Sequence, residues 1–231
     1  MTLASPPVIA LDGPSGSGKS TVARCVATHL GWRYVDTGAT YRAATLAVLR
    51  SGVDLADPSA IEKAVFAADI AVSTDPLSQD VRLDGEDVSA VIRGAQVTAA
   101  VSAVSAIPAV RVMLVELQRR LAGTTGAVLE GRDIATAVFP EAPVKVYLDA
   151  SAEVRASRRA ADADSGVTAG ATDLVAAVTV DLARRDRLDS SRAASPLVAA
   201  GDAVHLDSST MDAAAVVACV LQLAQDAGLV T

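Results

Sequence analysis

The sequence has few of the residues that build disulfide frameworks or metal centres. Its 231 residues include two cysteines, Cys25 and Cys219, and two histidines, His29 and His205. Two cysteines far apart make no disulfide framework, and we expect them as small core residues in a reducing compartment. The two histidines lack the spacing of a metal site. The sequence therefore predicts neither a disulfide scaffold nor a histidine-bound metal.

Long apolar runs are also missing, and the first nine residues carry no basic cluster. We therefore expect neither a membrane span nor a signal peptide, and a cytoplasmic protein with no membrane partner. The content of 51% hydrophobic and 20% charged residues is typical of a soluble globular protein with one core, or a core and an inserted piece. A net charge of -7 argues against a nucleic-acid partner.

Lysine is rare as well, because only Lys19, Lys63 and Lys145 occur among the 20 lysines and arginines. Nearly all the positive charge is therefore arginine, whose planar fork binds phosphate bidentately. An arginine excess can follow from genome composition, so the clustering of arginines is more informative than their total. The two clusters are EVRASRR at 153–159 and RRDRLDSSR at 184–192.

The clearest motif is GPSGSGKS at 13–20, which matches the phosphate-loop pattern G-x-x-x-x-G-K-[ST]. Its glycines let backbone N–H groups point at phosphate oxygens, and the helix that follows adds its positive end. In such loops the lysine, here Lys19, reaches the outer phosphates, and the hydroxyl of Ser20 ligates Mg²⁺. A plain glycine turn is the alternative. An apolar strand before the loop and a helical pattern after it favour a nucleoside triphosphate site.

Strand and helix patterns alternate along the chain and predict an α/β fold, with a parallel sheet covered on both faces. We expect strands at 7–12, 32–38, 126–133, 144–151 and 203–209. We expect helices at 19–30, 39–52, 59–69, 95–122 with an interruption at Pro108, 152–162, 172–188 and 211–228. Residues 70–92 differ, because their alternation and the Asp84-Gly85 turn predict short antiparallel strands in an insertion.

Polar residues follow two of the expected strands, at the end where parallel sheets form binding crevices. DTGATYR at 36–42 directs Tyr41 and Arg42 toward a second ligand, and its alternative is an ordinary corner capped by Thr37. EGRD at 130–133 places Arg132 and Asp133 in the crevice, and its alternative is that these two only pair with each other.

The two arginine clusters have helical spacing. The first aligns Arg155, Arg158 and Arg159 ahead of a glycine-containing loop, as in a mobile lid. The second puts Arg185, Asp189 and Arg192 on one helix face. A solvated, salt-bridged helix is the alternative for each cluster. With a phosphate loop upstream, however, the clusters together indicate an anion pocket.

Taken together, these stretches resemble bacterial cytidylate kinase. The resemblance runs in order from residue 8 to 210, over VIALDGPSGSGKSTVA, VDTGATYR, EGRDIATAVFPEAPVKVYLDAS and RDRLDSSRAASPL. Many NTPases share the phosphate loop, whereas the other three blocks together are specific to this family. The family often has aspartate and glycine where this chain has Glu130 and Ala135, and an apolar residue is more usual where it has Thr40. Glu130 keeps the charge, which suggests a supporting role near Mg²⁺.

The resemblance implies transfer of the γ-phosphoryl group of ATP to CMP or dCMP, with Mg²⁺, by a monomer. It implies a P-loop NTPase-type core at 1–38 and 123–231, a monophosphate-binding insertion at 39–122 and a lid segment at 155–172. The implied ATP site is Gly13, Pro14, Ser15, Gly16, Ser17, Gly18, Lys19, Ser20 and Thr21. The implied nucleotide-acceptor site is Thr37, Tyr41, Arg42, Ser102, Arg111, Arg132, Asp133, Arg185, Asp189 and Arg192. The implied catalytic cations are Lys19, Arg155, Arg158 and Arg159.

Within the acceptor site, the resemblance assigns base recognition to Ser102, Arg111 and Asp133. It assigns the acceptor phosphate to Arg42, Arg132, Arg185 and Arg192, and the sugar hydroxyl to Asp189. A carboxylate suits cytosine, because it accepts a hydrogen bond from the exocyclic amine but would face an oxygen in uracil.

The chemistry agrees with the absence of a catalytic histidine, since phosphoryl transfer to an ionised phosphate needs no general base. Two alternatives stay open. One is another P-loop kinase, for UMP or a small hydroxylated metabolite. The other is a nucleotide-dependent switch, which the paired arginine clusters disfavour.

Overall fold

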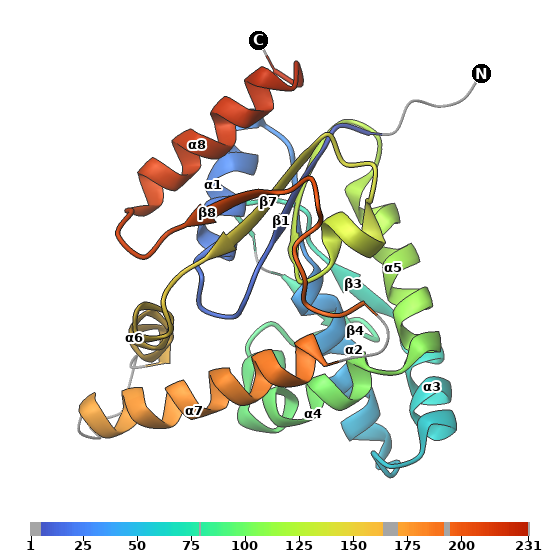
Figure 1. The fold of residues 1–231 in the computed structure, drawn as a ribbon. Coiled ribbons are helices and arrows are strands. Elements are labelled where there is room, and N and C mark those ends of the chain that lie inside the picture. Colours follow the sequence, from blue (N-terminus) through green and yellow to red (C-terminus); the bar gives the residue numbers. More distant parts are fainter. Residues whose placement is uncertain (1–5, 79, 164–170, 192–194, 231) are drawn as a thin grey trace.

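A five-stranded parallel sheet forms the centre of the molecule, seen in a computed structural model that describes residues 6–78, 80–163, 171–191 and 195–230 (Figure 1). The strand order is β2-β6-β1-β7-β8. These strands are β1 (Val8–Asp12), β2 (Arg33–Asp36), β6 (Ala127–Gly131), β7 (Val144–Asp149) and β8 (Val204–Asp207). All four neighbouring pairs are parallel, so the predicted fold class is confirmed.

Strand β1 lies at the middle of the sheet, and all five of its residues are buried. Such a continuous apolar run is expected where helices cover both faces of a parallel sheet. Asp12, the last residue of β1, is the one charged residue of this strand, and it is only 2% exposed. In register, Asp12 lies beside Gly131 of β6 on one side and Tyr147 of β7 on the other.

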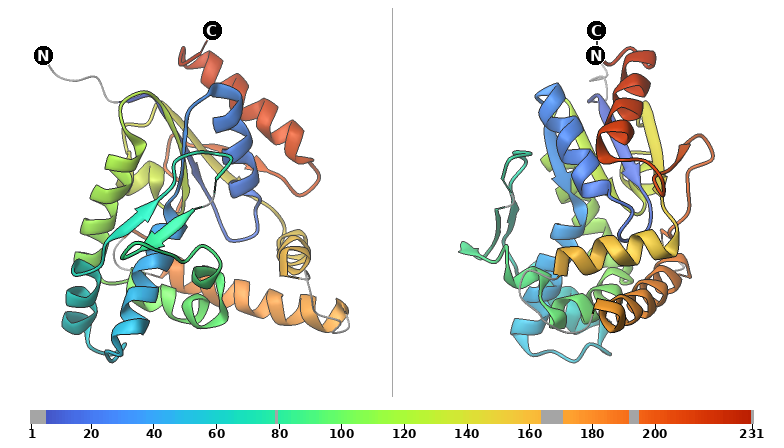
Figure 2. Two further views of the ribbon diagram at one scale, coloured as in Figure 1. Left: turned by 180° about the vertical axis from the view of Figure 1, so that it is seen from behind. Right: turned by 90° about the vertical axis from the view of Figure 1, so that its left-hand side faces the viewer.

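Helices cover both faces of this sheet (Figures 1 and 2). Helices α1 (Lys19–Leu30) and α8 (Ala213–Asp226) pack on one face, over a core that includes Ile9, Leu11 and Val128. On the other face α5 (Pro108–Ala122) and η2 (Ile134–Val138) pack over Val8, Ala10 and Leu129. The helix α1 ends at Gly31, where φ is 65°, at the stop that the sequence predicts.

A second, smaller sheet comes from the segment that the sequence marks as different. It has the antiparallel order β3-β4-β5, with β3 (Ile70–Val72), β4 (Val81–Leu83) and β5 (Glu86–Asp87). Asp84 and Gly85 link β4 to β5 with φ of 51° and 81°. Two successive left-handed residues make the hairpin turn that an Asp-Gly pair favours.

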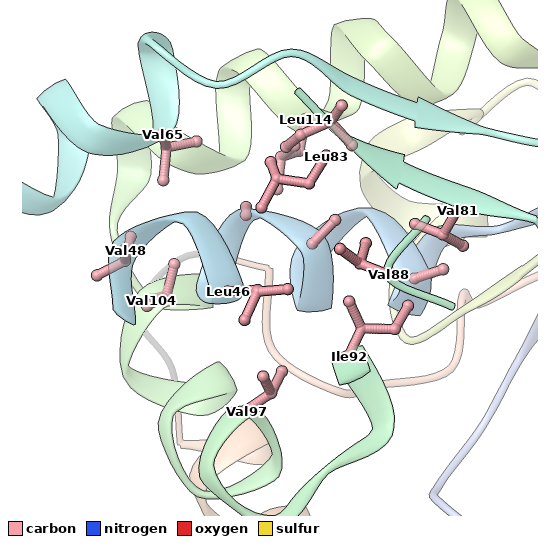
Figure 3. Close-up of a cluster of buried hydrophobic side chains, with 14 of the residues drawn as sticks. Leu46, Val48, Val65, Val81, Leu83, Val88, Ile92, Val97, Val104 and Leu114 are labelled. Carbon is pink, nitrogen blue, oxygen red and sulfur yellow. The ribbon is translucent and has the colours of Figure 1, made fainter. Parts of the chain in front are cut away.

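This sheet packs with four helices around a core of its own. The helices are α2 (Thr37–Ser51), α3 (Pro58–Phe66), α4 (Ala95–Ser105) and α5, with the short 3₁₀ helix η1 (Val91–Arg93) between β5 and α4. Figure 3 shows Leu46 and Val48 of α2 among side chains from the small sheet, α3, α4 and α5. This core is separate from the two cores on the faces of the large sheet.

Two further helices lie below the carboxyl ends of the parallel strands. They are α6 (Ala152–Ala163) and α7 (Ala171–Ser190), which pack on each other, and α7 also contacts α4 (Figures 1 and 2). Among the described helices, none alone has the length and apolar composition of a membrane span, and α4 and α5 reach them only as a pair bent by 104°.

Two details differ from the sequence-based expectations. Cys25 is exposed and Cys219 is half-buried, so the prediction that both are core residues is wrong for Cys25. The second difference is η2, a five-residue π-helix directly after the EGRD stretch. The sequence did not predict it, because so short a segment shows no periodicity.

Candidate active site

A cavity of about 660 Å³ opens at the carboxyl ends of the parallel strands. Its walls come from the phosphate loop and the start of α1, the start of α2, η1, the end of β6, α6, and the chain around the start of α8. The charged residues on these walls are Lys19, Asp36, Arg42, Arg93, Glu130, Arg132, Asp133, Arg158, Arg159 and Asp212. Six of these ten side chains are basic, which suits an anionic ligand.

The phosphate loop has a backbone that only glycine can adopt at two tightly packed points. Gly13 has φ of 147°, and a Cβ there would lie 2.0 Å from the carbonyl oxygen of Leu148. Gly16 has φ of 80°, and a Cβ there would lie 2.8 Å from the carbonyl oxygen of Arg155. The loop is therefore held in shape by the backbones of β7 and α6. Ser15 to Thr21 line the cavity, whereas Gly13 and Pro14 lie behind its wall.

Lys19 begins α1 and folds back over its own loop. Its ammonium donates to the carbonyl oxygen of Pro14 at 2.6 Å and to the hydroxyl of Ser17 at 3.3 Å. Burial lowers the pKa of Lys19 to about 7, and the nearby charge of Arg132 also lowers it. A partly desolvated cation at this place interacts strongly with a phosphate, because little water screens it.

Ser20 faces the cavity beside a carboxylate. Its hydroxyl donates to Glu130 Oε2 at 2.9 Å, and Tyr34 donates to Oε1 of the same carboxylate. Burial raises the pKa of Glu130 to about 7, and the negative charge of Asp36 adds to that rise. Asp36 lies on the same wall and was not predicted from the sequence. Oxygen donors from a hydroxyl and two carboxylates suit Mg²⁺, which prefers hard ligands.

The start of α2 is capped by Asp36, whose carboxylate accepts from Ala39 N at 2.9 Å. The alternative that Thr37 caps this corner is therefore wrong. Thr37 lies in the first turn, lines the cavity, and donates to the carbonyl oxygen of Glu130 at 2.6 Å. Thr40 continues this chain of contacts, since it donates to the carbonyl oxygen of Thr37 at 2.7 Å and accepts from Gln118 of α5 at 3.0 Å.

Tyr41 and Arg42 lie on the cavity wall, as the sequence predicts. Arg42 donates to the hydroxyl of Thr98 in α4 at 3.0 Å, and to the carbonyl oxygen of Ile92 at 3.3 Å. The wall continues at Arg93, which was not predicted from the sequence. A lone arginine in a segment of irregular pattern carries no signal that would have marked it.

Asp133 lies on the wall and pairs with Arg111 rather than with its neighbour Arg132. Both partners of this ion pair are nearly buried, with side chains 7% and 6% exposed. The guanidinium of Arg111 also lies 5.4 Å from the centre of the Tyr41 ring, in cation–π contact. The alternative that Arg132 and Asp133 only pair with each other is therefore wrong. Ser102, in α4, is not on the wall.

Arg132 also lies on the wall and is held from behind by two carboxylates of α7. Its Nη2 lies 3.2 Å from Asp189 Oδ2, and its Nη1 lies 3.7 Å from Asp186 Oδ1. It also donates to the carbonyl oxygen of Gly13 at 3.0 Å. Asp189 is buried behind the wall. Asp186, which was not predicted from the sequence, contributes to the same set of ion pairs.

The three arginines of α6 take different positions. Arg158 and Arg159 line the cavity, and Arg158 is anchored by Ser208 through its hydroxyl at 2.9 Å and its carbonyl oxygen at 2.7 Å. Arg155 lies behind the loop, where it pairs with Asp186 at 2.5 Å and donates to the carbonyl oxygen of Ser15 at 3.2 Å.

Two predicted residues cannot be placed on any wall. Arg192 lies outside the described residues, and Arg185 belongs to α7 but its side chain is outside the described part of the chain. The predicted lid segment, 155–172, likewise includes seven residues, 164–170, that are not described.

Comparisons with known proteins agree over nearly the whole chain. A model of the family described as cytidylate kinase matches residues 9–226. A cytidylate kinase of Rhodococcus opacus is 57% identical over 205 residues, 88% of each chain. Those of Nocardia farcinica and Mycolicibacterium paratuberculosis are 56% and 53% identical, over 90% and 93% of each chain.

Proposed function

The chain belongs to the cytidylate kinase family, and on this premise we propose that its cavity holds ATP and CMP or dCMP together. The enzyme transfers the γ-phosphoryl group of ATP, giving ADP and CDP or dCDP. The observation that carries this proposal is the cavity itself, where a phosphate loop faces a second set of arginines. One set of cations suits the donor phosphates, and the other suits the acceptor phosphate.

ATP is the donor, with its phosphates in the loop Gly13–Thr21. The loop N–H groups and Lys19 bind the β- and γ-phosphates. Beyond the loop, Met211, Ala213 and Val216 give the cavity an apolar stretch, which suits a nucleobase.

CMP or dCMP is the acceptor. Asp133 accepts from the exocyclic amine of cytosine, and Arg111 keeps that carboxylate oriented by its buried ion pair. Uracil would present an oxygen at the same place and repel the carboxylate. Arg42 and Arg132 bind the acceptor phosphate, with Arg185 and Arg192 of the second cluster. Thr37 and Tyr41 line this part of the site, Asp189 binds the sugar hydroxyl, and Ser102 supports base recognition from α4.

Magnesium fits the oxygen atoms around Ser20. The Ser20 hydroxyl would bind the ion. Glu130 and Asp36 lie on the same wall, where their carboxylates would bind water molecules of the ion's hydration shell. Mg²⁺ is usually bound by one or two protein oxygens together with substrate phosphates, so the ATP phosphates would supply further ligands. The bound ion would neutralise charge on the β- and γ-phosphates.

Catalysis consists of positioning and charge neutralisation. The acceptor oxygen is already ionised, so no side chain has to remove a proton. Lys19, Arg158 and Arg159 lie on the cavity wall and stabilise the charge on the moving group. Arg155 joins them as residues 155–172 close over the site, which excludes water and limits ATP hydrolysis.

The division of the chain follows from these roles. Residues 1–38 and 123–231 form the ATP-binding core, and residues 39–122 form the monophosphate-binding insertion. Each part has its own hydrophobic core. The enzyme works as a cytoplasmic monomer.

The direct test mixes the protein with Mg·ATP and, separately, CMP, dCMP, UMP and AMP, and follows ADP release. We expect fast release with CMP or dCMP, slower release with UMP, and little with AMP. Fast release with UMP alone would favour the UMP kinase alternative. If no monophosphate stimulated release, the proposal would be wrong. Removal of the metal with EDTA should stop the reaction with every acceptor.

A further inference from the structure

Asp12 is a buried carboxylate to which the reaction described above gives no part. It ends β1, directly before the phosphate loop, and is 2% exposed. A carboxylate so deep in the protein is costly unless it is hydrogen-bonded, so its partners matter. They do not belong to the phosphate loop.

Both oxygens of Asp12 accept hydrogen bonds from the start of η2. Ile134 N donates to Oδ1 and Ala135 N donates to Oδ2, each at 2.8 Å. The first N–H groups of a helix have no partner within the helix, and a negative charge there is favourable. Asp12 therefore caps η2 from a strand that lies more than 120 residues earlier.

The residues just before η2 are those of base and phosphate recognition. Asp133 directly precedes Ile134, and its carbonyl oxygen accepts from Val138 N at 3.3 Å, which closes the π-turn. Arg132 donates to the carbonyl oxygen of Gly13 at 3.0 Å. The loop between β6 and η2 is thus fastened to the end of β1 at two adjacent residues, Asp12 and Gly13. π-helical turns of this kind occur frequently at functional sites.

Space around the loop is tight as well. A Cβ on Gly131 would lie 2.6 Å from Ile134 Cδ1 and 2.7 Å from the hydroxyl oxygen of Thr37. The loop therefore has little freedom to shift without moving its neighbours. At the start of η2 the Asp12 carboxylate holds two successive N–H groups, which fixes the other end of the loop.

We propose that Asp12 is a positioning residue for base selection, which fixes the backbone at 133–135 so that Asp133 meets the amine of cytosine. This inference rests on the proposed role of Asp133 as the cytosine reader. Asp12 acts through the backbone of η2, and it does not touch either substrate. Its loss should therefore weaken the preference for cytosine more than it weakens ATP binding.

The test replaces Asp12 by Asn, which leaves only one oxygen as acceptor for two N–H groups. We expect the ratio of kcat/KM for CMP to that for UMP to fall about 10-fold. The fall should come from the KM for CMP, with the KM for ATP unchanged. Asp149→Asn is the matched control, because Asp149 ends the neighbouring β7 and accepts from Ala150 N at 2.8 Å. It should leave the ratio unchanged. Equal losses for CMP and UMP in Asp12→Asn would overturn the proposal.

A double variant separates this inference from the role of Asp133. If Asp12 acts through Asp133, Asp12→Asn should not reduce base selectivity further in an Asp133→Ala background. A further loss of selectivity would overturn the proposal. If Asp133→Ala alone leaves selectivity intact, the proposed role of Asp133 fails instead, and this inference fails with it.

A measurement on the unaltered enzyme covers the case in which the Asp12 variant does not fold. Burial raises the pKa of Asp12 to about 6, although the two N–H donors lower it. The charged groups that face Asp12 are Asp133, which raises this pKa, and Lys19, which lowers it. Protonation below that pH removes an acceptor oxygen. The CMP-to-UMP ratio should therefore fall about 3-fold between pH 7.5 and 5.5. Both substrates carry the same phosphate, whose own ionisation cancels. A constant ratio would overturn the proposal.

Discussion

The two halves of the cavity are built by different means. The donor half, Gly13–Thr21, takes its shape from backbone contacts, since β7 and α6 approach its glycines too closely for any side chain. In the acceptor half, by contrast, side chains hold side chains. Its side chains contact side chains from other helices and strands: Arg111 pairs with Asp133, Arg132 pairs with Asp189, and Arg42 donates to Thr98.

The difference has a chemical reason. Triphosphate binding by backbone N–H groups needs only a fixed main chain, which a glycine loop supplies by itself. Recognition of one base and one phosphate needs charged groups at set positions, and a buried charge without a partner is costly. Arg111 and Arg132 are therefore held by carboxylates of the same chain, and Arg42 by a hydroxyl and a carbonyl oxygen. Changes to the two halves should have different consequences, and four predictions test this.

Lys19→Ala should have the largest effect, because it removes the cation of the donor half. We expect kcat to fall about 1,000-fold with every acceptor, since the lost charge stabilises the moving group whatever receives it. Steady-state assays with CMP, dCMP and UMP measure this. Lys63→Ala, at an exposed position of α3, is the control, and its kcat should equal that of the unaltered enzyme. Near-normal rates for Lys19→Ala would contradict its phosphate role.

Asp133→Ala should act selectively on the acceptor half. We expect kcat/KM to fall about 100-fold with CMP and less with UMP, as a discriminating contact to the base is lost. The variant should also lose about 3 kcal/mol of unfolding free energy, because Arg111 is left buried and unpaired. Asp80→Ala, which breaks an exposed pair with Arg82, should change neither quantity. Equal losses with both bases would remove Asp133 as the cytosine reader.

Asp12 links the halves, and its titration should appear in the stability of the ligand-free protein. Burial raises its pKa from 3.8 to about 6. Between these two pH values the folded state holds a proton that the unfolded state has released, so stability falls as pH rises. The expected loss is about 2–3 kcal/mol between pH 4 and 6.5. Urea unfolding at both pH values measures it, and an identical pH dependence in Asp12→Asn would be evidence against this assignment.

Thr40→Val should have the smallest effect of the four. It keeps the shape of a buried side chain but removes the hydroxyl between Thr37 and Gln118. We expect a loss of about 1–2 kcal/mol in unfolding free energy and a few-fold rise in the KM for CMP alone. Thr28→Val is the control, since its hydroxyl makes a similar bond to Arg24 O on an exposed face. If Thr40→Val lowered the unfolding free energy no more than Thr28→Val does, the prediction that the buried hydroxyl stabilises this part of the site would be wrong.

The donor half could be predicted from the sequence because its signals are local. The glycine pattern, the preceding apolar strand and the stop at Gly31 all lie within about 25 residues. The Asp84-Gly85 turn of the small sheet is an equally local signal, since two adjacent residues carry it. The positions of Tyr41, Arg42, Arg132 and Asp133 on the wall also followed, because residues leave parallel strands at one edge of the sheet.

The acceptor half resisted prediction in its pairings. Arg111 meets Asp133 only because α5 packs beside β6 and η2, and Arg132 meets Asp189 only because α7 runs under the sheet. Pairings of this kind depend on tertiary packing, and no spacing in the sequence encodes them. Two alternatives that the sequence left open, Arg132 paired with Asp133 and α2 capped by Thr37, rested only on nearness along the chain. Asp36, a better cap one residue earlier, was missed for the same reason.

The central claim is that one cavity holds both nucleotides, so that the phosphoryl group passes directly between them. The most direct measurement follows ATP labelled on the γ-phosphate, incubated with the enzyme and Mg²⁺ in the presence and absence of CMP. The account predicts label in CDP when CMP is present, and almost no labelled inorganic phosphate in either case. Release of labelled inorganic phosphate at the same rate with and without CMP would contradict it.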